Sequence, residues 1–559
     1  MRHMRRKVFR ITSFWIVGVL TLFLGAPHVA LAGVGVGSGG GTPGTASNIT
    51  LVGHDSLFDR GMNAALALYA DRSTGRSFVY VGNRTDGSLP CSQTGNVQPC
   101  HASSNIHTHP GILIVDVSDP TTPTNVGEIG PPHAALPGIT TRELRVWPQQ
   151  KLLMVMTFRC SSVIHDCAPG NDTTFPFNIK FFDLSDPVQP RFLGGYVPTE
   201  HAGTQVKPHE MYLWVDPGDA DRALLWLSTP TTSVDPNRPN LMIVDISRVP
   251  GSVPGSQPAP VVTTAPVTEV AEGTWNQFFP GAANPANYDF DLSLHSMAPT
   301  ADGDRTNLAY LRGGFGVLDT SAVVGDTDDH FISLNDKLLT PVQNFVRWGT
   351  GNQCPGHTAA GCSESHSAVP VPGRPFELST DEVYGTFTVP SFGWPWGWAR
   401  LINVANPVRP HLLGEYKIFQ NTQTFQGSPG DDPATEQFTS YSSHNPTVLR
   451  DLAFIAWHSG GLQAIDISDP GDATQAGWFS PAPLTSVATE DPALNGGPNK
   501  VTVWSYPIIS NGLIYVIDIR NGLYVLRYAG ADASEVAGIR FLEGNSNLGD
   551  AVRLTRNHQ

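Results

Sequence analysis

The sequence predicts an all-β fold, a seven-bladed β-propeller built from four-stranded antiparallel sheets. Three observations support this prediction. A short strand-like segment recurs seven times along the 559 residues, a second apolar segment precedes each copy, and few helical patterns lie between them. Repeats with a constant internal pattern and variable insertions indicate one supersecondary unit used many times. A ring of such units leaves few strand edges exposed, which favours a propeller.

The recurring segment is an apolar strand that ends in a polar residue before a turn. In the first copy, the strand Ile112–Asp116 precedes the turn Ser118-Asp119-Pro120. The equivalent end positions lie 61 to 84 residues apart and are Asp116, Asp183, Asp245, Asp319, Asn403, Asp466 and Arg527. The residue five places earlier is Gly or Asn in six of the seven copies, so we expect a hairpin turn there.

A second strand is predicted to pair with each copy across that turn. The predicted partners are Phe78–Gly82, Leu152–Met156, Leu224–Leu227, Leu308–Leu311, Val383–Phe387, Leu452–Trp457 and Leu513–Ile517. Ile49–Gly53 is expected to supply the outer strand of the seventh unit and to lock the ring, with Ile539–Leu542 as the alternative. We therefore expect one propeller domain over residues 48–530.

These copies resemble the LVIVD repeat, which is named for strands such as Ile112–Asp116 and Leu241–Asp245. The resemblance extends over residues 48–530. It implies a propeller fold and no particular function.

Residues 1–32 are predicted to be a signal peptide. A basic start precedes the apolar stretch Ile11–Leu24 and the Ala-x-Ala pattern at Ala30–Ala32. A retained membrane anchor is the alternative, and the pair Arg5-Arg6 leaves twin-arginine export open beside the general secretory route. We expect an exported protein, whether periplasmic, secreted or on the cell surface, with no transmembrane span after removal of the signal peptide.

Charge and composition restrict the possible partners. Removal of the signal peptide changes the formal net charge from −15 to −20, because that segment carries five basic and no acidic residues. Such a charge does not favour nucleic acid, whose binding depends on Lys and Arg at phosphates. Residues 33–47 are Gly-rich and are predicted to be a flexible lead-in, and residues 531–559 a C-terminal tail.

The six cysteines form three close pairs, which in an exported chain predict local disulfides. The pairs are Cys91 with Cys100, Cys160 with Cys167, and Cys354 with Cys362. Thiolate metal sites are the alternative, although the two-residue spacing of zinc sites is missing. In the predicted topology these pairs share one face with a loop that holds Trp394, Trp396 and Trp398. Long, cross-linked loops indicate a functional face.

Four histidines are predicted to lie at the starts of axial strands in four successive units. They are His209, His295, His366 and His444, separated by 86, 71 and 78 residues. We expect them to converge on the central channel, where neutral imidazoles can bind iron, copper or zinc. Glu143, at the matching place in the second unit, is expected to orient a ligating imidazole. A structural ring of hydrogen-bonded histidines is the alternative.

A ring of axial histidines is similar to the four-histidine iron site of carotenoid cleavage oxygenases. It is also similar to the selenium-binding protein and methanethiol oxidase family, which has a seven-bladed form and is linked to copper. That second family carries a Cys-Ser-Ser-Cys motif, whereas Cys160-Ser161-Ser162 is followed here by Val163. These resemblances imply a class of chemistry and no substrate.

Four further polar residues come just after second strands and are expected to reach the same mouth: Arg84, Arg312, His458 and Arg520. Together they predict an electropositive rim suited to an anionic small molecule. The leading hypothesis is thus a metal-dependent oxidoreductase. The alternative is a non-catalytic scaffold whose looped face binds a protein or a glycan through its tryptophans. No nucleophile elbow, Walker loop or dinucleotide motif occurs in a suitable context.

Overall fold

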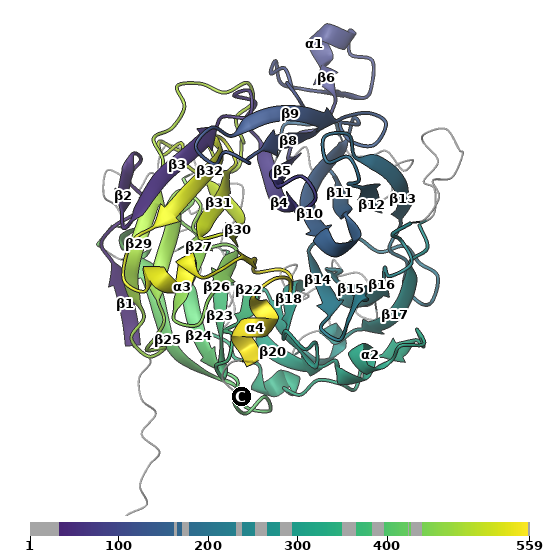
Figure 1. Ribbon diagram of the computed structural model, residues 1–559, viewed down its shortest axis with the longest axis vertical. Coiled ribbons are helices and arrows are strands. Elements are labelled where there is room, and N and C mark those ends of the chain that lie inside the picture. The colour runs from purple at the N-terminus through teal and green to yellow at the C-terminus, as the bar shows by residue number, and fades with distance from the viewer. Residues whose placement is uncertain are drawn as a thin grey trace, which may run out of the picture.

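The computed structural model describes residues 33–160, 165–169, 178–230, 238–251, 265–279, 293–348, 365–382, 396–422, 424–425 and 439–556. Its sheets are arranged in a ring around a central axis, so the prediction of an all-β propeller is confirmed (Figure 1). No helix within these residues has the length and apolarity needed to cross a membrane.

The first half of the ring contains one large sheet and two smaller ones. The eight-stranded sheet combines two meanders: β4 (Asn63–Asp71), β5 (Arg76–Asn83), β8 (Ile112–Asp116) and β9 (Thr124–Ile129), then β10 (Ile139–Trp147), β11 (Leu152–Arg159), β12 (Asn178–Asp183) and β13 (Arg191–Tyr196). A five-stranded sheet follows, with β14 (Met211–Asp216), β15 (Asp219–Ser228), β16 (Leu241–Asp245), β17 (Thr268–Gly273) and β21 (Ile332–Ser333). The next sheet has β18 (Leu294–Pro299), β19 (Arg305–Tyr310) and β20 (Gly314–Asp319).

Three five-stranded sheets complete the ring, and each includes an N-terminal strand. The first has β22 (Ser365–Pro370), β23 (Phe376–Asp381), β24 (Ala399–Asn403), β25 (His411–Ile418) and β1 (Gly33–Gly37). The second has β26 (Pro446–Val448), β27 (Leu452–Ala456), β28 (Leu462–Asp466), β29 (Thr474–Ser480) and β2 (Thr45–Ser47). The third has β30 (Val503–Ser510), β31 (Leu513–Asp518), β32 (Gly522–Tyr528), β3 (Ile49–Asp55) and β33 (Phe541–Leu542).

Short helices, turns and strands lie in the connections between the strands of the main sheets and in the C-terminal segment. A long loop of the first meander contains β6 (Leu89–Pro90), α1 (Cys91–Thr94) and β7 (Cys100–His101). The other helices are α2 (Ser321–Gly325), α3 (Ala533–Ala537), α4 (Ala551–Arg556) and the 3-10 turns η1 (Pro148–Gln150), η2 (Asn276–Phe278), η3 (Val342–Asn344) and η4 (Phe419–Asn421).

The sheet count differs from the expected seven separate four-stranded sheets. Within the described residues, five sheets have five or more strands and a sixth has three. The first two meanders merge because β10 pairs with β5 through Thr141 and Asn83. Some sheets also gain a fifth strand from elsewhere in the chain. β1 pairs with the edge strand β25, and β21 pairs with the edge strand β17. Both effects depend on long-range pairing, which the repeat pattern does not encode.

The polar residue that ends each repeat strand has a local structural cause. Asp116 Oδ1 accepts a hydrogen bond from the Ser118 backbone N–H at 2.8 Å, and Asp466 does the same from Ser468 at 2.9 Å. The same bond recurs at Asp183, Asp245, Asp319 and Asn403. A carboxylate or amide that captures the N–H two residues later stabilises the turn that ends the strand.

The N-terminal segment is ordered by the ring instead of forming a flexible lead-in. β3 pairs antiparallel with β32, which confirms that the N-terminal strand closes the last sheet. β33 pairs with the inner strand β30, so the alternative outer strand is wrong. β1 runs parallel to β25, and a Cβ at Gly33 or Gly35 would overlap the carbonyl oxygens of Gly471 and Ala473. The alternating glycines therefore allow close backbone packing.

One predicted strand is placed wrongly. The partner of β24 is β23, which spans Phe376–Asp381, whereas Val383–Phe387 lies outside the described residues. Buried polar side chains, among them Glu377 and Ser379, alternate along β23 and weaken its apolar pattern.

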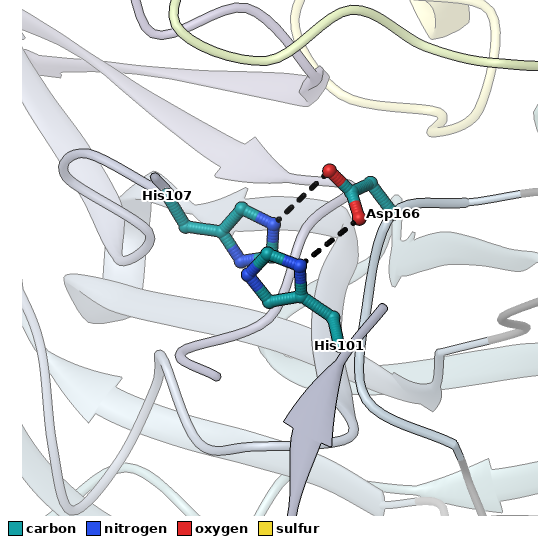
Figure 2. A group of neighbouring side chains, drawn as sticks. All are labelled: His101, His107 and Asp166. Carbon is teal, nitrogen blue, oxygen red and sulfur yellow. Dashed lines mark ion pairs between the residues drawn. The ribbon is translucent and has the colours of Figure 1, made fainter. Parts of the chain in front are cut away.

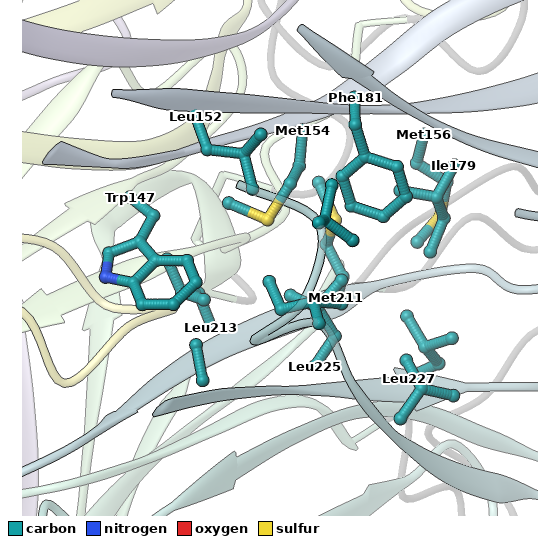
Figure 3. Close-up of a cluster of buried hydrophobic side chains, with 14 of the residues drawn as sticks. Trp147, Leu152, Met154, Met156, Ile179, Phe181, Met211, Leu213, Leu225 and Leu227 are labelled. Atoms are coloured by element: carbon teal, nitrogen blue, oxygen red, sulfur yellow. The ribbon is translucent and has the colours of Figure 1, made fainter. Parts of the chain in front are cut away.

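The hydrophobic core lies between neighbouring sheets. Figure 3 shows one such layer, where Trp147, Met154 and Phe181 from the second meander pack against Leu213 and Leu225 of the next sheet. All five side chains are fully buried. Each contributes roughly 1.5–3 kcal/mol by leaving water. This packing fixes the inner strands that carry the axial side chains.

Candidate metal centre

The four predicted axial histidines come together, each at the start of an inner strand. Consecutive ring centroids lie 4.3 Å apart for His209 and His295, 3.9 Å for His295 and His366, and 4.1 Å for His366 and His444. The Nε2 atoms of His209 and His295 are 2.8 Å apart, a hydrogen bond in which one ring donates and the other accepts. The chain thus builds a close row of imidazoles, which we call the axial cluster.

Serine hydroxyls hold this row in position. Ser228 donates to the carbonyl oxygen of His295 at 2.6 Å, and Ser296 donates to that of His366. Each serine lies one sheet before the histidine that it fixes. The Nδ1 atom of His366 is hydrogen-bonded to Ser367 Oγ at 2.8 Å, which turns its Nε2 atom toward the neighbouring carboxylates. That Nε2 atom is buried and has no hydrogen-bond partner within the described residues.

Two carboxylates that the sequence did not single out face the row. Glu382, directly after β23, lies 3.4 Å from His366 Nε2 and 3.3 Å from His444 Nε2. Glu210, just before β14, lies 3.9 Å from both His295 Nδ1 and His366 Nε2. Two sets of three ligand atoms result, each lying within 4.8 Å of one another: Glu210, His295 and His366, and then His366, Glu382 and His444. His366 belongs to both sets.

The cluster combines neutral imidazoles with an ionised carboxylate. Burial, followed by the neighbouring rings, holds the pKa values of His209 and His366 well below the usual range. Burial likewise keeps the pKa of His444 well below its usual range and lowers that of His295 to about 4. Burial opposes ionisation of Glu382, yet His444 and His458 lower its pKa to about 2. Neutral imidazole and ionised carboxylate are the forms that bind metals.

Glu143 lies close to Glu210, and its described ion pair is with Arg145. Its carboxylate pairs with Arg145 at 3.0 Å, and burial raises its pKa against the effect of that arginine. Burial and then the nearby Glu143 raise the pKa of Glu210 to about 8. The Tyr506 hydroxyl donates to Glu210 Oε2 at 3.2 Å. Glu143 therefore acts on Glu210, and its described contacts do not include an imidazole.

The C-terminal segment also reaches this part of the axis. The backbone N–H of Leu213 donates to Asn545 O at 3.1 Å, and that of Val215 donates to Asn547 Oδ1 at 2.8 Å. Figure 1 shows the segment between α3 and α4 crossing from the last sheet toward β14 and β18. Asn545 and Asn547 thus contact the inner strand β14, and Phe541–Leu542 pairs with the inner strand β30.

The expected electropositive rim is largely neutralised. Arg84 pairs with Asp491 at 3.0 Å, and Arg520 pairs with Glu490 at 2.9 Å, with both arginine side chains only 3 % exposed. His458 is fully buried, and its Nε2 atom lies 3.1 Å from Glu382, so it joins the axial cluster. Arg312 lies in the turn after β19 and is partly exposed.

The long-loop face is cross-linked as expected where the structure describes it. The disulfides Cys91–Cys100 and Cys160–Cys167 are present, with Cα atoms 4.9 and 6.1 Å apart. Cys354 and Cys362 lie outside the described residues, as does Trp394.

The two described tryptophans of that face are not exposed anchors. Trp396 and Trp398 are 4 % and 8 % exposed and belong to a core cluster. The Arg400 guanidinium and the Lys417 ammonium both lie over the Trp398 ring. A partner protein or glycan would find little of these two rings to bind.

Comparison with known families supports the repeat assignment. The LVIVD repeat matches residues 108–129 and 447–478, so the predicted resemblance is confirmed at these two places. No curated protein matches the chain.

Solved structures similar to this chain include Sqt1 from Chaetomium thermophilum, with 10 % identity, coverage of 84 % of this chain and 86 % of that chain, and a TM-score of 0.37. The Cps50 (Swd1) propeller domain from Myceliophteria thermophila has 11 % identity, covers 86 % of this chain and 98 % of its own, and has a TM-score of 0.36. A complex of the Chaetomium Sqt1 with the N-terminus of ribosomal protein L10 has 11 % identity, coverage of 84 % and 89 %, and a TM-score of 0.34. Likenesses at these scores carry no functional information.

Proposed function

We propose that this chain is an exported LVIVD-repeat propeller of seven repeat units that holds one transition metal ion in its axial cluster and acts as a metal-dependent oxidoreductase. One observation carries the proposal. His366 Nε2 is buried without a hydrogen-bond partner in the described part of the chain, and it belongs to two overlapping groups of potential ligands. A buried imidazole nitrogen without a partner is unfavourable unless an ion or another group satisfies it.

The donor set suits iron, copper or zinc. Imidazole binds all three, and three or four imidazoles with a nearby carboxylate offer both neutral and anionic ligands. His295, His366 and His444 would supply the main ligands, with His209 as the fourth. When bound, such an ion supplies a redox or Lewis-acid centre for oxidation of a small molecule.

The surrounding residues prepare the site for a cation. Ser367 fixes the orientation of the His366 ring, and Ser228 fixes the backbone of His295. Glu382 keeps one negative charge next to His366 and His444. Tyr506 holds Glu210, whose raised pKa leaves its carboxyl group able to bind or release a proton near neutral pH.

The proposal includes export of the protein. Two described disulfides and the signal-like segment 1–32 support it, because disulfides persist in oxidising compartments. Within the described residues, no helix is suited to span a membrane.

Elemental analysis of the purified mature protein tests the metal assignment. We expect close to one equivalent of transition metal associated with the axial cluster, and loss of that equivalent in His366→Ala. His411→Ala is the matched control, because His411 is exposed at the start of β25. If wild type and His366→Ala contain the same amount of metal after reconstitution, the cluster is a structural ring of histidines. The remaining hypothesis is then a non-catalytic body that binds a protein or a glycan.

A further inference from the structure

A second group of potential ligands lies in the cross-linked loops, away from the axial cluster. His101 and His107 come from the long loop between β5 and β8, and Asp166 comes from the loop after β11. Figure 2 shows both imidazoles directed toward the Asp166 carboxylate. One ligand atom from each of the three residues lies within 4.8 Å of the other two.

The geometry within this group is close. His101 Nδ1 lies 3.3 Å from Asp166 Oδ1, and His107 Nε2 lies 3.7 Å from Asp166 Oδ2. The two imidazole rings stack with their centroids 4.2 Å apart and an angle of 10° between their planes. Both side chains are at most 1 % exposed.

The ring nitrogens of His101 make no hydrogen bond within the described residues, although Nδ1 faces Asp166. Its side chain is fully buried, and neither ring nitrogen has a hydrogen-bond partner within the described ranges. The Nε2 atom of His107 is likewise buried without a hydrogen bond there. Leaving buried imidazole nitrogens in this condition is unfavourable. An ion between the two rings and the carboxylate would bind one nitrogen of each ring and so satisfy two of these three nitrogens.

Neighbouring groups orient the other two ligands. The Nδ1 atom of His107 is hydrogen-bonded to the Asp86 carbonyl oxygen at 2.9 Å. A ligating histidine commonly uses its second nitrogen in this way. Asp166 Oδ2 accepts hydrogen bonds from Ser103 at 2.7 Å and from Asn105 at 2.8 Å, while Oδ1 faces His101.

Two disulfides flank the ligands. His101 follows Cys100, which is bonded to Cys91, and Asp166 precedes Cys167, which is bonded to Cys160. Each cross-link restricts the backbone next to one of these two ligands before any ion binds.

We propose that His101, His107 and Asp166 form a second metal site, which takes a divalent transition metal such as zinc and joins the loop of the first meander to that of the second. Two imidazoles and one carboxylate are a common zinc ligand set, and three protein ligands leave one tetrahedral position open for water or an anionic ligand. The site is independent of the axial cluster, because the two share no residue.

Zinc binding by equilibrium dialysis, with elemental analysis of the dialysed protein, tests the proposal. The variants Asp166→Asn and His107→Gln keep nearly the same side-chain volume, and each should bind one zinc fewer per chain than the wild type. His109→Ala is the control from the same loop, because its side chain is 42 % exposed and pairs with Glu128. It should bind as much zinc as the wild type.

The axial cluster is tested separately in the same experiment. His366→Ala should lose one equivalent and keep the loop site, and the double variant His366→Ala/Asp166→Asn should lose both. If His366→Ala changes nothing while Asp166→Asn loses one zinc, the axial proposal fails and the loop site remains.

Melting temperatures measured with and without zinc distinguish a loss of zinc binding from a folding defect in a variant. Zinc should raise the melting temperature of the wild type and of His109→Ala, and it should raise that of Asp166→Asn by less. Equal zinc content and an equal zinc-induced shift in wild type, Asp166→Asn and His107→Gln would overturn the loop site.

Discussion

Replacing Glu382 by Gln should weaken metal binding at the axial cluster without disturbing its shape. The Glu382 carboxylate lies 3.1 Å from His458, 3.3 Å from His444 and 3.4 Å from His366. Its pKa of about 2 means that it stays ionised throughout the range in which proteins are handled. Gln retains the size of the side chain and removes the charge.

The expected loss of metal affinity follows from these three contacts. Loss of an outer partner of a metal ligand typically lowers affinity by about 10- to 100-fold. Since Glu382 contacts three imidazoles and carries a full charge, we expect about 100-fold, or about 2.8 kcal/mol at 1.4 kcal/mol per factor of ten. Because the carboxylate does not titrate between pH 5 and 9, this ratio should be constant over that range.

Glu377→Gln is a matched control on β23, the strand that precedes Glu382. Glu377 is fully buried, and burial raises its pKa well above the usual range, which disfavours a charge at this position. Its carboxyl oxygens have no hydrogen-bond partner in the described part of the chain. Gln should therefore leave zinc affinity unchanged. The assay is competition between the protein and a chelator of known zinc affinity, at pH 6, 7 and 8. Equal dissociation constants for wild type and Glu382→Gln, or equal weakening in both variants, would refute this role for the carboxylate.

Three further changes test the fold around the site by urea unfolding. Lys180→Met should stabilise the protein at pH 7, because burial lowers the pKa of Lys180 to about 8 from 10.5, and a charged lysine then destabilises the fold. The destabilisation by charged Lys180 decreases as pH rises through 8 toward 10.5. The gain in free energy of unfolding of Lys180→Met over wild type should therefore fall by about 2 kcal/mol between pH 7 and 10. A gain that is constant with pH would contradict the lowered pKa. Arg400→Ala should destabilise the fold by about 3–5 kcal/mol because it leaves buried Asp381 without its cation, and a loss below about 1 kcal/mol would argue against that pairing. Phe181→Ala should cost about 3–5 kcal/mol through loss of a fully buried ring, and a much smaller change would indicate that the layer in Figure 3 repacks.

Local signals in the sequence were sufficient for the repeat units. The turn after each strand depends on one side chain and an N–H two residues away, as Asp116 and Ser118 show. The apolar strands before these turns are equally local, so most predicted second strands overlap those in the structure. The spacing of these units also placed His209, His295, His366 and His444 at equivalent strand starts, and their rings do converge.

Pairings between distant segments were not visible in the sequence. The parallel addition of β1 to β25 joins residues nearly 400 positions apart, and the Gly-rich pattern that permits it by itself predicts a flexible segment. The link between Thr141 and Asn83 likewise depends on how the inner strand β10 meets β5, the second strand of the neighbouring unit.

Glu382 was missed because its strand was misplaced. Arg84, His458 and Arg520 were found as residues that follow second strands, and Glu382 occupies the same kind of position after β23. The buried polar residues of β23 concealed the strand, so this shared position could not be recognised. Glu210 was adjacent to a predicted ligand, but no sequence pattern showed that its carboxylate would lie near His366 as well.

The most direct test of the axial centre is an anomalous difference map from crystals of the metal-loaded protein, collected at the absorption edge of the metal that elemental analysis identifies. We predict a peak enclosed by the imidazole nitrogens of His295, His366 and His444, with Glu382 beside it. Crystals that contain the metal but show no peak among these side chains would contradict the central claim.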